Sequence, residues 1–226
     1  MPHFRLIAVD DHPVVVEGLA TLLLREAPEF AWSGAARTYQ ELLDRIESLR
    51  RDEGDVRIVV LVDLNLGDGG DPVERVRELV TMNTRVVVLT SEVRPIPLRH
   101  AVQAGALGLA LKSDDGAAIA DVVRCVARGE QGLSPEIAFA LASDDTLVPQ
   151  LSERELQVLR LLADGLPRKS VGNRLNPPVK LATVATYLNR IFHKYQETGR
   201  SVTTYQDAVR EAVRDGYLPR PDDYVS

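Results

Sequence analysis

The first half of the chain alternates between two hydrophobic patterns. Short runs such as Phe4–Val9 are apolar on both faces, which predicts strands buried in a parallel sheet. Segments between them, such as Pro13–Glu26, carry apolar residues at helical spacing. We predict strands over Phe4–Val9, Ala31–Ala36, Arg57–Val62, Arg85–Leu89 and Leu107–Leu111, and helices over Pro13–Glu26, Tyr39–Arg51, Pro72–Met82, Ile96–Ala104 and Gly116–Arg128.

Strand and helix thus follow each other in five successive units. This order predicts an α/β fold, because right-handed crossovers place the strands parallel in one sheet with helices on both faces. We assign residues 1–128 to a (βα)5 domain with a five-stranded parallel sheet. The alternation of strands and helices ends over residues 129–150, where glycine and proline recur. We predict a linker there, in which Pro135–Ala142 could form a short helix.

Residues 151–218 show only helical spacing. Ser152 and Glu155 predict a capping box that opens a first helix, which Gly165 ends. Two short helices joined by a tight turn, the later one basic, fit a helix-turn-helix in an all-α four-helix domain. The second to fourth helices are predicted over Arg168–Leu175, Thr183–Tyr195 and Tyr205–Asp215, and residues 219–226 as a flexible tail.

The composition fits two domains in a reducing compartment. A chain of 226 residues with 45% apolar residues can build two cores. The single cysteine, Cys125, excludes an intramolecular disulfide, and we expect it in a core or on a helix surface. Acidic residues interrupt the N-terminal apolar stretch and no apolar run reaches membrane-spanning length, so we expect a cytoplasmic protein without a membrane partner.

Charge divides unevenly between the two parts. Residues 151–226 hold 12 Lys/Arg and 9 Asp/Glu, a net +3, whereas residues 1–150 hold 15 and 24, a net −9. Between residues 168 and 200, seven basic residues accompany a single acid, Glu197. This concentration favours contact of the second part with a polyanion such as nucleic acid.

Three aspartates stand at the ends of predicted strands. Asp10 and Asp11 follow Phe4–Val9, and Asp63 follows Arg57–Val62. Because the carboxyl ends of parallel strands share one edge of the sheet, we expect these carboxylates to meet there. Clustered anions stay ionised together only beside a cation, and hard oxygen ligands suit Mg²⁺, which also accepts phosphate oxygens. The pattern predicts a site that handles phosphoryl groups.

Other interpretations of the same region fit less well. Asp63, Asn65 and Glu74 match three positions of a calcium-binding EF-hand loop, but Asp68 stands where that loop requires glycine. The glycine-rich segment that follows Asp63 lacks the lysine and hydroxyl of a nucleotide-binding P-loop. The four histidines show no metal-ligand spacing, so we expect ordinary surface or packing roles for them.

Short motifs stand at four predicted strand ends, in residues 9–13, 62–64, 88–91 and 105–112. With these motifs the chain resembles the receiver part of bacterial response regulators of the LuxR-type (NarL/FixJ) class. The resemblance implies a flavodoxin-like receiver domain in which Asp63 is the phosphoacceptor. It also implies that Asp10, Asp11, Asp63 and the backbone carbonyl of Asn65 hold Mg²⁺, and that Thr90 and Lys112 contact the phosphoryl oxygens.

The second part resembles the LuxR-type DNA-binding domain. The similarity lies in residues 151–155, 158–163 and 165–166, and in Thr183-Val184, which open the recognition helix. It implies that Ala185, Thr186 and Asn189 occupy base-reading positions. We also expect Thr183 among the DNA-binding residues, and we expect the cations Arg168, Lys169, Arg190 and Lys194 to hold the DNA backbone. The apolar stripe Tyr205, Ala208, Val209, Ala212 and Val213 suits the dimerisation helix of this class.

Several residues depart from the family pattern. Ala185 replaces the usual cation after Thr183-Val184, and Tyr187 replaces the usual histidine. In the receiver, Leu109 stands in place of the aromatic switch residue, and Gly67 in place of the usual proline. With Ala185 and Asn189 in the reading positions, we expect a half-site that contains A·T pairs.

We therefore predict a DNA-binding transcription factor, not an enzyme, that a sensor histidine kinase phosphorylates on Asp63 and that binds double-stranded DNA as a homodimer. The alternative is an atypical regulator controlled without aspartyl phosphorylation, through dimerisation, a ligand or protein contacts. A Mg²⁺-dependent phosphohydrolase is a more distant possibility, because the sequence offers no second carboxylate as an acid-base partner for a substrate.

Overall fold

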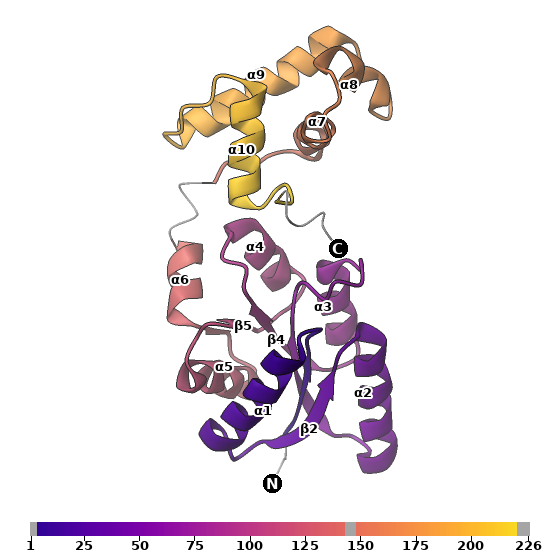
Figure 1. Cartoon of the computed structure of the whole chain (residues 1–226), viewed down its shortest axis with the longest axis vertical. Coiled ribbons are helices and arrows are strands. Elements are labelled where there is room, and N and C mark those ends of the chain that lie inside the picture. The colour runs from indigo at the N-terminus through magenta and orange to yellow at the C-terminus, as the bar shows by residue number, and fades with distance from the viewer. Residues whose placement is uncertain (1–3, 143–147, 221–226) are drawn as a thin grey trace. The chain divides into compact units, whose positions relative to one another are not determined.

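The structure is a computed structural model that describes residues 4–142 and 148–220. The chain divides into two compact units (Figure 1). Among the described residues, the first unit comprises residues 4–93 and 98–140, and the second comprises residues 94–97, 141–142 and 148–220. Residues 143–147 of the predicted linker and residues 221–226 of the predicted tail lie outside the described residues. Among the residues described, no helix combines the length and apolar character that a membrane span requires.

The first unit is built on a parallel sheet with the strand order β2-β1-β3-β4-β5-β6. The α/β prediction is confirmed, and most predicted elements match within one or two residues at each end. The elements are β1 (Phe4–Val9), α1 (Pro13–Glu26), β2 (Ala31–Ala36), α2 (Tyr39–Glu53), β3 (Arg57–Val62), α3 (Pro72–Thr81), β4 (Arg85–Thr90), α4 (Pro95–Gln103), β5 (Gly108–Leu111) and α5 (Gly116–Arg128).

The segment predicted as a linker contributes two further elements. β6 (Gly132–Leu133) pairs with β5 as a sixth, edge strand, and α6 (Pro135–Ala142) follows it. The helix matches the short one that the sequence pattern allowed. The strand was missed because two residues are too few to show a period of alternating burial. The sheet therefore has six strands rather than five, and part of the expected linker belongs to the first unit.

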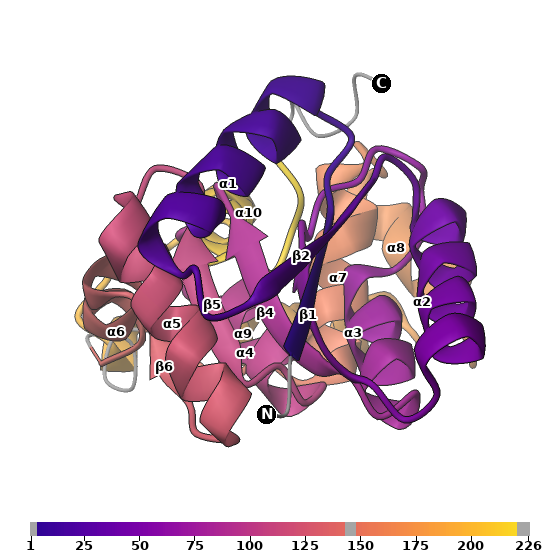
Figure 2. The same ribbon diagram turned by 90° about the horizontal axis from the view of Figure 1, so that it is seen from below.

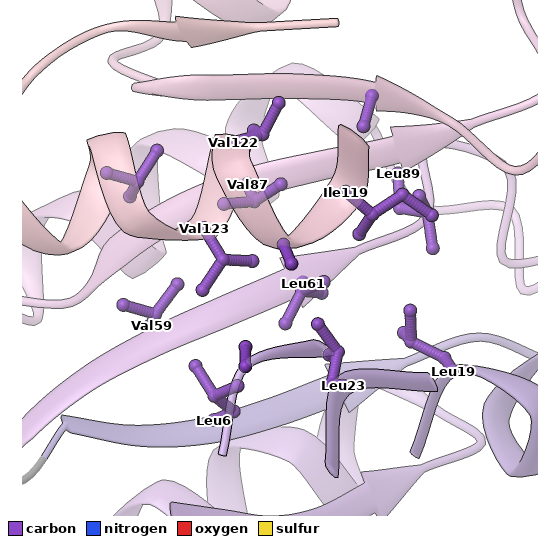
Figure 3. Close-up of a cluster of buried hydrophobic side chains, with 14 of the residues drawn as sticks. Leu6, Leu19, Leu23, Val59, Leu61, Val87, Leu89, Ile119, Val122 and Val123 are labelled. Atoms are coloured by element: carbon purple, nitrogen blue, oxygen red, sulfur yellow. The ribbon is translucent and has the colours of Figure 1, made fainter. Parts of the chain in front are cut away.

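Helices cover both faces of this sheet. Figure 2 shows α1 and α5 on one side and α2 and α3 on the other. On the first side, Leu6, Leu61 and Val87 of the strands form one buried cluster with Leu23 of α1 and Val123 of α5, each at most 1% exposed (Figure 3). Strands buried on both faces explain the continuous apolar runs in the sequence.

Within residues 148–220, the second unit contains four helices, as predicted: α7 (Glu153–Ala163), α8 (Arg168–Arg174), α9 (Leu181–Glu197) and α10 (Tyr205–Asp215). The capping box of Ser152 and Glu155 is present, and Gly216 ends α10 in the left-handed conformation. α9 is two residues longer at each end than predicted. Its buried residues Val184, Leu188, Ile191 and Tyr195 pack in a single core with α7 and α10.

Candidate functional site

The acidic residues predicted as a site meet at the carboxyl edge of the sheet. Val9 of β1 pairs with Val62 of β3, so the residues that follow them are neighbours. The Asp63 amide continues the ladder by donating to the carbonyl of Val9 at 3.1 Å. Between the next two strands, the amide of Lys112 donates to the carbonyl of Thr90 at 2.9 Å. The sheet register therefore brings acids and lysine to one edge.

Lys112 lies between two buried carboxylates. Its Nζ atom is 2.7 Å from Asp63 Oδ2 and 2.7 Å from Asp10 Oδ2. Asp10 is 3% exposed and Asp63 4% exposed, so both carboxylates have lost most of their contact with solvent. A cation at this position offsets the repulsion between them.

The pKa values of this group reflect burial and pairing. Burial raises the pKa of Asp63, although Lys112 and the backbone amide of Asn65 act against the increase. For Lys112, burial acts to lower the pKa, but the carboxylates of Asp10 and Asp63 outweigh it and hold the pKa above its ordinary value. Lys112 is therefore a fixed positive charge beside the Asp63 carboxylate.

The group also offers ligands for a metal ion. Ligand atoms of Asp10, Asp11, His12 and Asp63 all lie within 4.8 Å of one another. Asp10 Oδ2 and Asp11 Oδ1 are buried oxygen atoms that accept no well-directed hydrogen bond, although Lys112 and His12 respectively lie close to them. Carboxylate oxygens short of hydrogen bonds fit a hard cation such as Mg²⁺.

His12 is a member of the group that the sequence interpretation missed. Its Nδ1 atom lies 2.8 Å from Asp11 Oδ1 and 3.2 Å from Asp10 Oδ1, and its backbone amide donates to Asp10 Oδ1 at 2.9 Å. The side chain is 66% exposed. In the sequence, only its position directly after Asp10 and Asp11 indicated that His12 belongs to this group, because no second histidine stands at metal-ligand spacing from it.

Thr90 ends β4 at the same edge and is fully buried. Its hydroxyl oxygen accepts a hydrogen bond from the amide of Glu92 at 3.0 Å. A hydroxyl that accepts one bond still has its own proton to donate. The role of Thr90 and that of the Asn65 carbonyl stay predictions.

The predicted DNA contacts of the second unit differ in exposure. Arg168, Lys169, Thr186, Asn189 and Arg190 are exposed, whereas Thr183 and Ala185 are half-buried. In the part of the chain that the structure describes, none of the three arginine and lysine residues in this exposed set pairs with an acid. The helix-turn-helix therefore presents free cations beside the predicted reading positions.

Lys194 is engaged within its own unit. Its Nζ atom donates to Glu155 Oε2 at 2.6 Å and to the carbonyl of Gln150 at 2.8 Å. Glu155 is only 3% exposed, so this ammonium group compensates a buried charge. Its expected contact with the DNA backbone stays a prediction, but the ion pair gives Lys194 a structural role that the sequence did not reveal.

The apolar stripe on α10 is mostly turned into its own unit. Ala208 and Ala212 are fully buried in the core of this unit, and the assignment of Ala212 to a dimer contact stays a prediction. Tyr205, Val209 and Val213 are half-buried and pack at the edge of the same core. Only these three residues retain surface for another chain.

The second unit matches one family model. The model described as bacterial regulatory proteins, luxR family, matches residues 149–205, which include α7, α8 and α9.

Curated relatives match along nearly the whole chain. The chain is 30% identical to the transcriptional regulatory protein LiaR of Bacillus subtilis (strain 168) over 206 residues, which are 87% of this chain and 93% of that protein. It is 32% identical to the response regulator GacA of Pseudomonas aeruginosa, with 95% and 97% covered. It is 27% identical to the nitrate/nitrite response regulator protein NarL of Escherichia coli (strain K12), with 86% and 90% covered.

Solved structures share the fold. RcsB from Salmonella enterica serovar Typhimurium, bound to promoter rprA in the presence of the phosphomimetic BeF3−, matches with a TM-score of 0.64 at 19% identity over 91% of this chain and 96% of that chain. The response regulator ChrA of a heme-sensing two component system matches with a TM-score of 0.51 at 27% identity, over 96% and 100%.

Proposed function

Because the chain belongs to the LuxR-type (NarL/FixJ) family of response regulators, which are DNA-binding transcription factors, we propose that phosphorylation of Asp63 switches its activity. In this proposal, a sensor histidine kinase supplies the phosphoryl group, Mg²⁺ is required, and the protein binds DNA as a homodimer. We assign the phosphorylation to the first unit and DNA binding to the second.

In the transfer, a carboxylate oxygen of Asp63 attacks the phosphorus atom carried on the kinase's histidine. An O–P bond forms while the N–P bond breaks, and the released imidazole nitrogen keeps the electron pair and takes up a proton. A carboxylate is a weak nucleophile toward an anionic phosphoryl group, so the charge that accumulates must be offset by cations. Lys112, 2.7 Å from Asp63 Oδ2, supplies one of them.

Asp10, Asp11, Asp63 and the backbone carbonyl of Asn65 would hold the Mg²⁺ ion. When bound, Mg²⁺ supplies further positive charge for the phosphoryl oxygens. The buried oxygens of Asp10 and Asp11 that lack well-directed hydrogen bonds support this assignment. Thr90 would donate its hydroxyl proton to a phosphoryl oxygen.

One observation carries the proposal: a lysine Nζ atom lies 2.7 Å from the carboxylates of both Asp63 and Asp10 at the carboxyl edge of a parallel sheet. This arrangement pairs a nucleophile with a cation and leaves other carboxylate oxygens for a metal. An ordinary structural ion pair would not require the third acid, Asp11, within 4.8 Å of the same group.

Labelling with a small phosphodonor tests the proposal. The chain should form an acid-stable, alkali-labile acyl phosphate with acetyl phosphate in the presence of Mg²⁺. Asp63→Asn keeps the shape of the side chain but removes the nucleophile, so labelling should vanish. Labelling that persists in Asp63→Asn would move the site elsewhere, and absence of labelling in the unmodified chain would favour control without phosphorylation.

For DNA, we propose that Ala185, Thr186 and Asn189 read bases while Arg168, Lys169 and Arg190 hold the phosphates. The exposure of Thr186 and Asn189 on α9 supports this division. The amide of Asn189 suits adenine, and the methyl groups of Ala185 and Thr186 suit thymine.

The alternative of control without aspartyl phosphorylation is kept for one specific reason. Leu109, fully buried in β5, replaces the aromatic residue that such receivers usually carry there. Any change at Thr90 on phosphorylation would therefore have to be transmitted without the aromatic side chain that usually couples to it.

A further inference from the structure

The loop that follows Asp63 has little intrinsic rigidity. Between β3 and α3 it contains Gly67, Gly69 and Gly70, and the φ angles of the first two are +63° and +75°. Glycine loses more conformational entropy on ordering than any other residue. A fixed loop at this position therefore needs side-chain contacts from elsewhere.

The loop lies directly against the acidic site. A Cβ atom added at Gly67 would lie 2.9 Å from Asp11 Oδ2. The same loop begins with Asn65, whose amide contacts the Asp63 carboxylate. Movement of the loop would therefore change the surroundings of two of the acids.

A buried arginine of α3 holds the loop in place. Arg75 is 7% exposed, and its guanidinium pairs with Asp68 in the loop. A Cβ atom at Gly70 would overlap this guanidinium, so the loop backbone packs closely against it. On its other side, the guanidinium lies 5.2 Å from the ring centroid of Tyr39, whose hydroxyl donates to Glu78 Oε2 at 2.9 Å.

We propose that Arg75 is a positioning residue for the phosphoryl site. By binding Asp68 it holds the glycine-rich loop against Asp11, and thereby keeps Asp11 and the Asn65 carbonyl arranged to bind Mg²⁺. This inference rests on the proposed function of the acidic site. Groups that hydrogen-bond metal ligands directly typically change metal affinity by about 10–100-fold when they are lost, and because Arg75 acts one contact further out, through Asp68 and the loop, we expect an effect at the lower end of this range.

The test weakens the contact without emptying the buried position of Arg75. Asp68→Asn removes the charge of a partly exposed partner, and Gly70→Ala displaces the guanidinium tip, which is flexible enough to move. Arg77→Gln is the control, because Arg77 is exposed on the same helix and pairs only with Glu74 among the described residues. Three quantities are measured in the full chain: hydrogen exchange of the loop amides, Mg²⁺ affinity by calorimetry, and the rate of labelling by acetyl phosphate.

We expect faster exchange of the loop amides and about tenfold weaker Mg²⁺ binding in Asp68→Asn and Gly70→Ala, with the control unchanged. Labelling in these variants should recover at high Mg²⁺ concentration, which a folding defect would not allow. Faster exchange with unaltered Mg²⁺ affinity, or unaltered exchange, would overturn the positioning role. If the unmodified chain binds Mg²⁺ but is not labelled, the proposed function fails while the Mg²⁺ affinities still decide the role of Arg75.

Discussion

At the scale of single residues, the role of a charged side chain depends on whether it pairs with a buried group of opposite charge. Lys112 is held between Asp10 and Asp63, and Lys194 is held by Glu155. In the sequence, Lys112 follows a predicted strand and is expected to contact a phosphoryl group, whereas Lys194 lies on a basic helix and is expected to contact DNA. The tertiary contacts add that each ammonium group compensates a buried carboxylate.

Glu155 provides a pH prediction. Burial acts to raise its pKa, but hydrogen bonds from Lys194 and Ser152 outweigh burial and hold the pKa below its usual value of 4.5. A carboxyl group whose pKa falls on folding stabilises the native state fully above its unfolded-state pKa, and this contribution is lost as pH falls through the folded-state pKa. Calorimetry of the full chain between about pH 3 and pH 7 should show that Glu155→Gln lowers the unfolding temperature of the second unit most at neutral pH. A difference that stays constant down to the lowest pH would contradict this role.

Residue-level prediction from sequence succeeded where chain position sets the location. Asp10, Asp63 and Lys112 follow strand ends, and the register of a parallel sheet brings such residues together. The sequence did not identify His12 as a member of the acidic group, because no second histidine stands at metal-ligand spacing from it. It also did not reveal the ion pair between Lys194 and Glu155. Their separation of 39 residues shows no local pattern that sequence reading could use.

At the scale of elements, α9 carries a predicted DNA contact, Arg190, and a residue that stabilises the unit, Lys194. Arg190→Ala should weaken binding to all DNA sequences and reduce the salt slope by about one counterion, because the exposed guanidinium has no ion pair within the described chain. Lys194→Ala should instead lower the free energy of unfolding by about 1–3 kcal/mol, since it leaves Glu155 buried without a cation. DNA titrations at several salt concentrations and urea unfolding measure the two effects. An equal loss of unfolding free energy in Arg190→Ala and Lys194→Ala would contradict the assignment of different roles to the two residues.

α10 carries the dimerisation prediction. Val209→Glu should weaken cooperative binding to two half-sites, because Tyr205, Val209 and Val213 are the part of the stripe that keeps some exposure. Phosphorylation of Asp63 should be unchanged. The exposed Arg214→Gln serves as the control, and circular dichroism checks that the second unit remains folded. Cooperative binding that persists in folded Val209→Glu would refute the assignment.

Elements were predicted well where burial is regular. Strands buried on both faces give continuous apolar runs, and the capping box of Ser152 and Glu155 marks the start of α7 directly. The sixth strand was missed because β6 is only two residues long and depends on pairing with β5. The dimerisation role of the α10 stripe stays a prediction, because helical periodicity does not distinguish a core face from an interface.

At the scale of the whole molecule, the two parts of the chain carry opposite charge, −9 for residues 1–150 and +3 for residues 151–226. Internal pairing changes how much of the positive charge is available, since Arg200 pairs with Glu211 and Asp215, and Lys194 with Glu155. Arg160, Arg210 and Arg214 are exposed but pair with acids of their own helices. A group of exposed cations lies on α8, α9 and the turn between them: Arg168, Lys169, Arg174, Lys180 and Arg190. This distribution supports DNA contact through the helix-turn-helix.

We propose that phosphorylation of Asp63 in one unit controls DNA binding by the other. The most direct measurement is the DNA affinity of the full chain at fixed salt with Mg²⁺, before and after treatment with acetyl phosphate, with Asp63→Asn treated in parallel. The account predicts that phosphorylation changes the affinity of the unmodified chain by at least about fivefold and leaves that of Asp63→Asn unchanged. Equal affinity of the phosphorylated and unphosphorylated chain, with labelling verified, would contradict it.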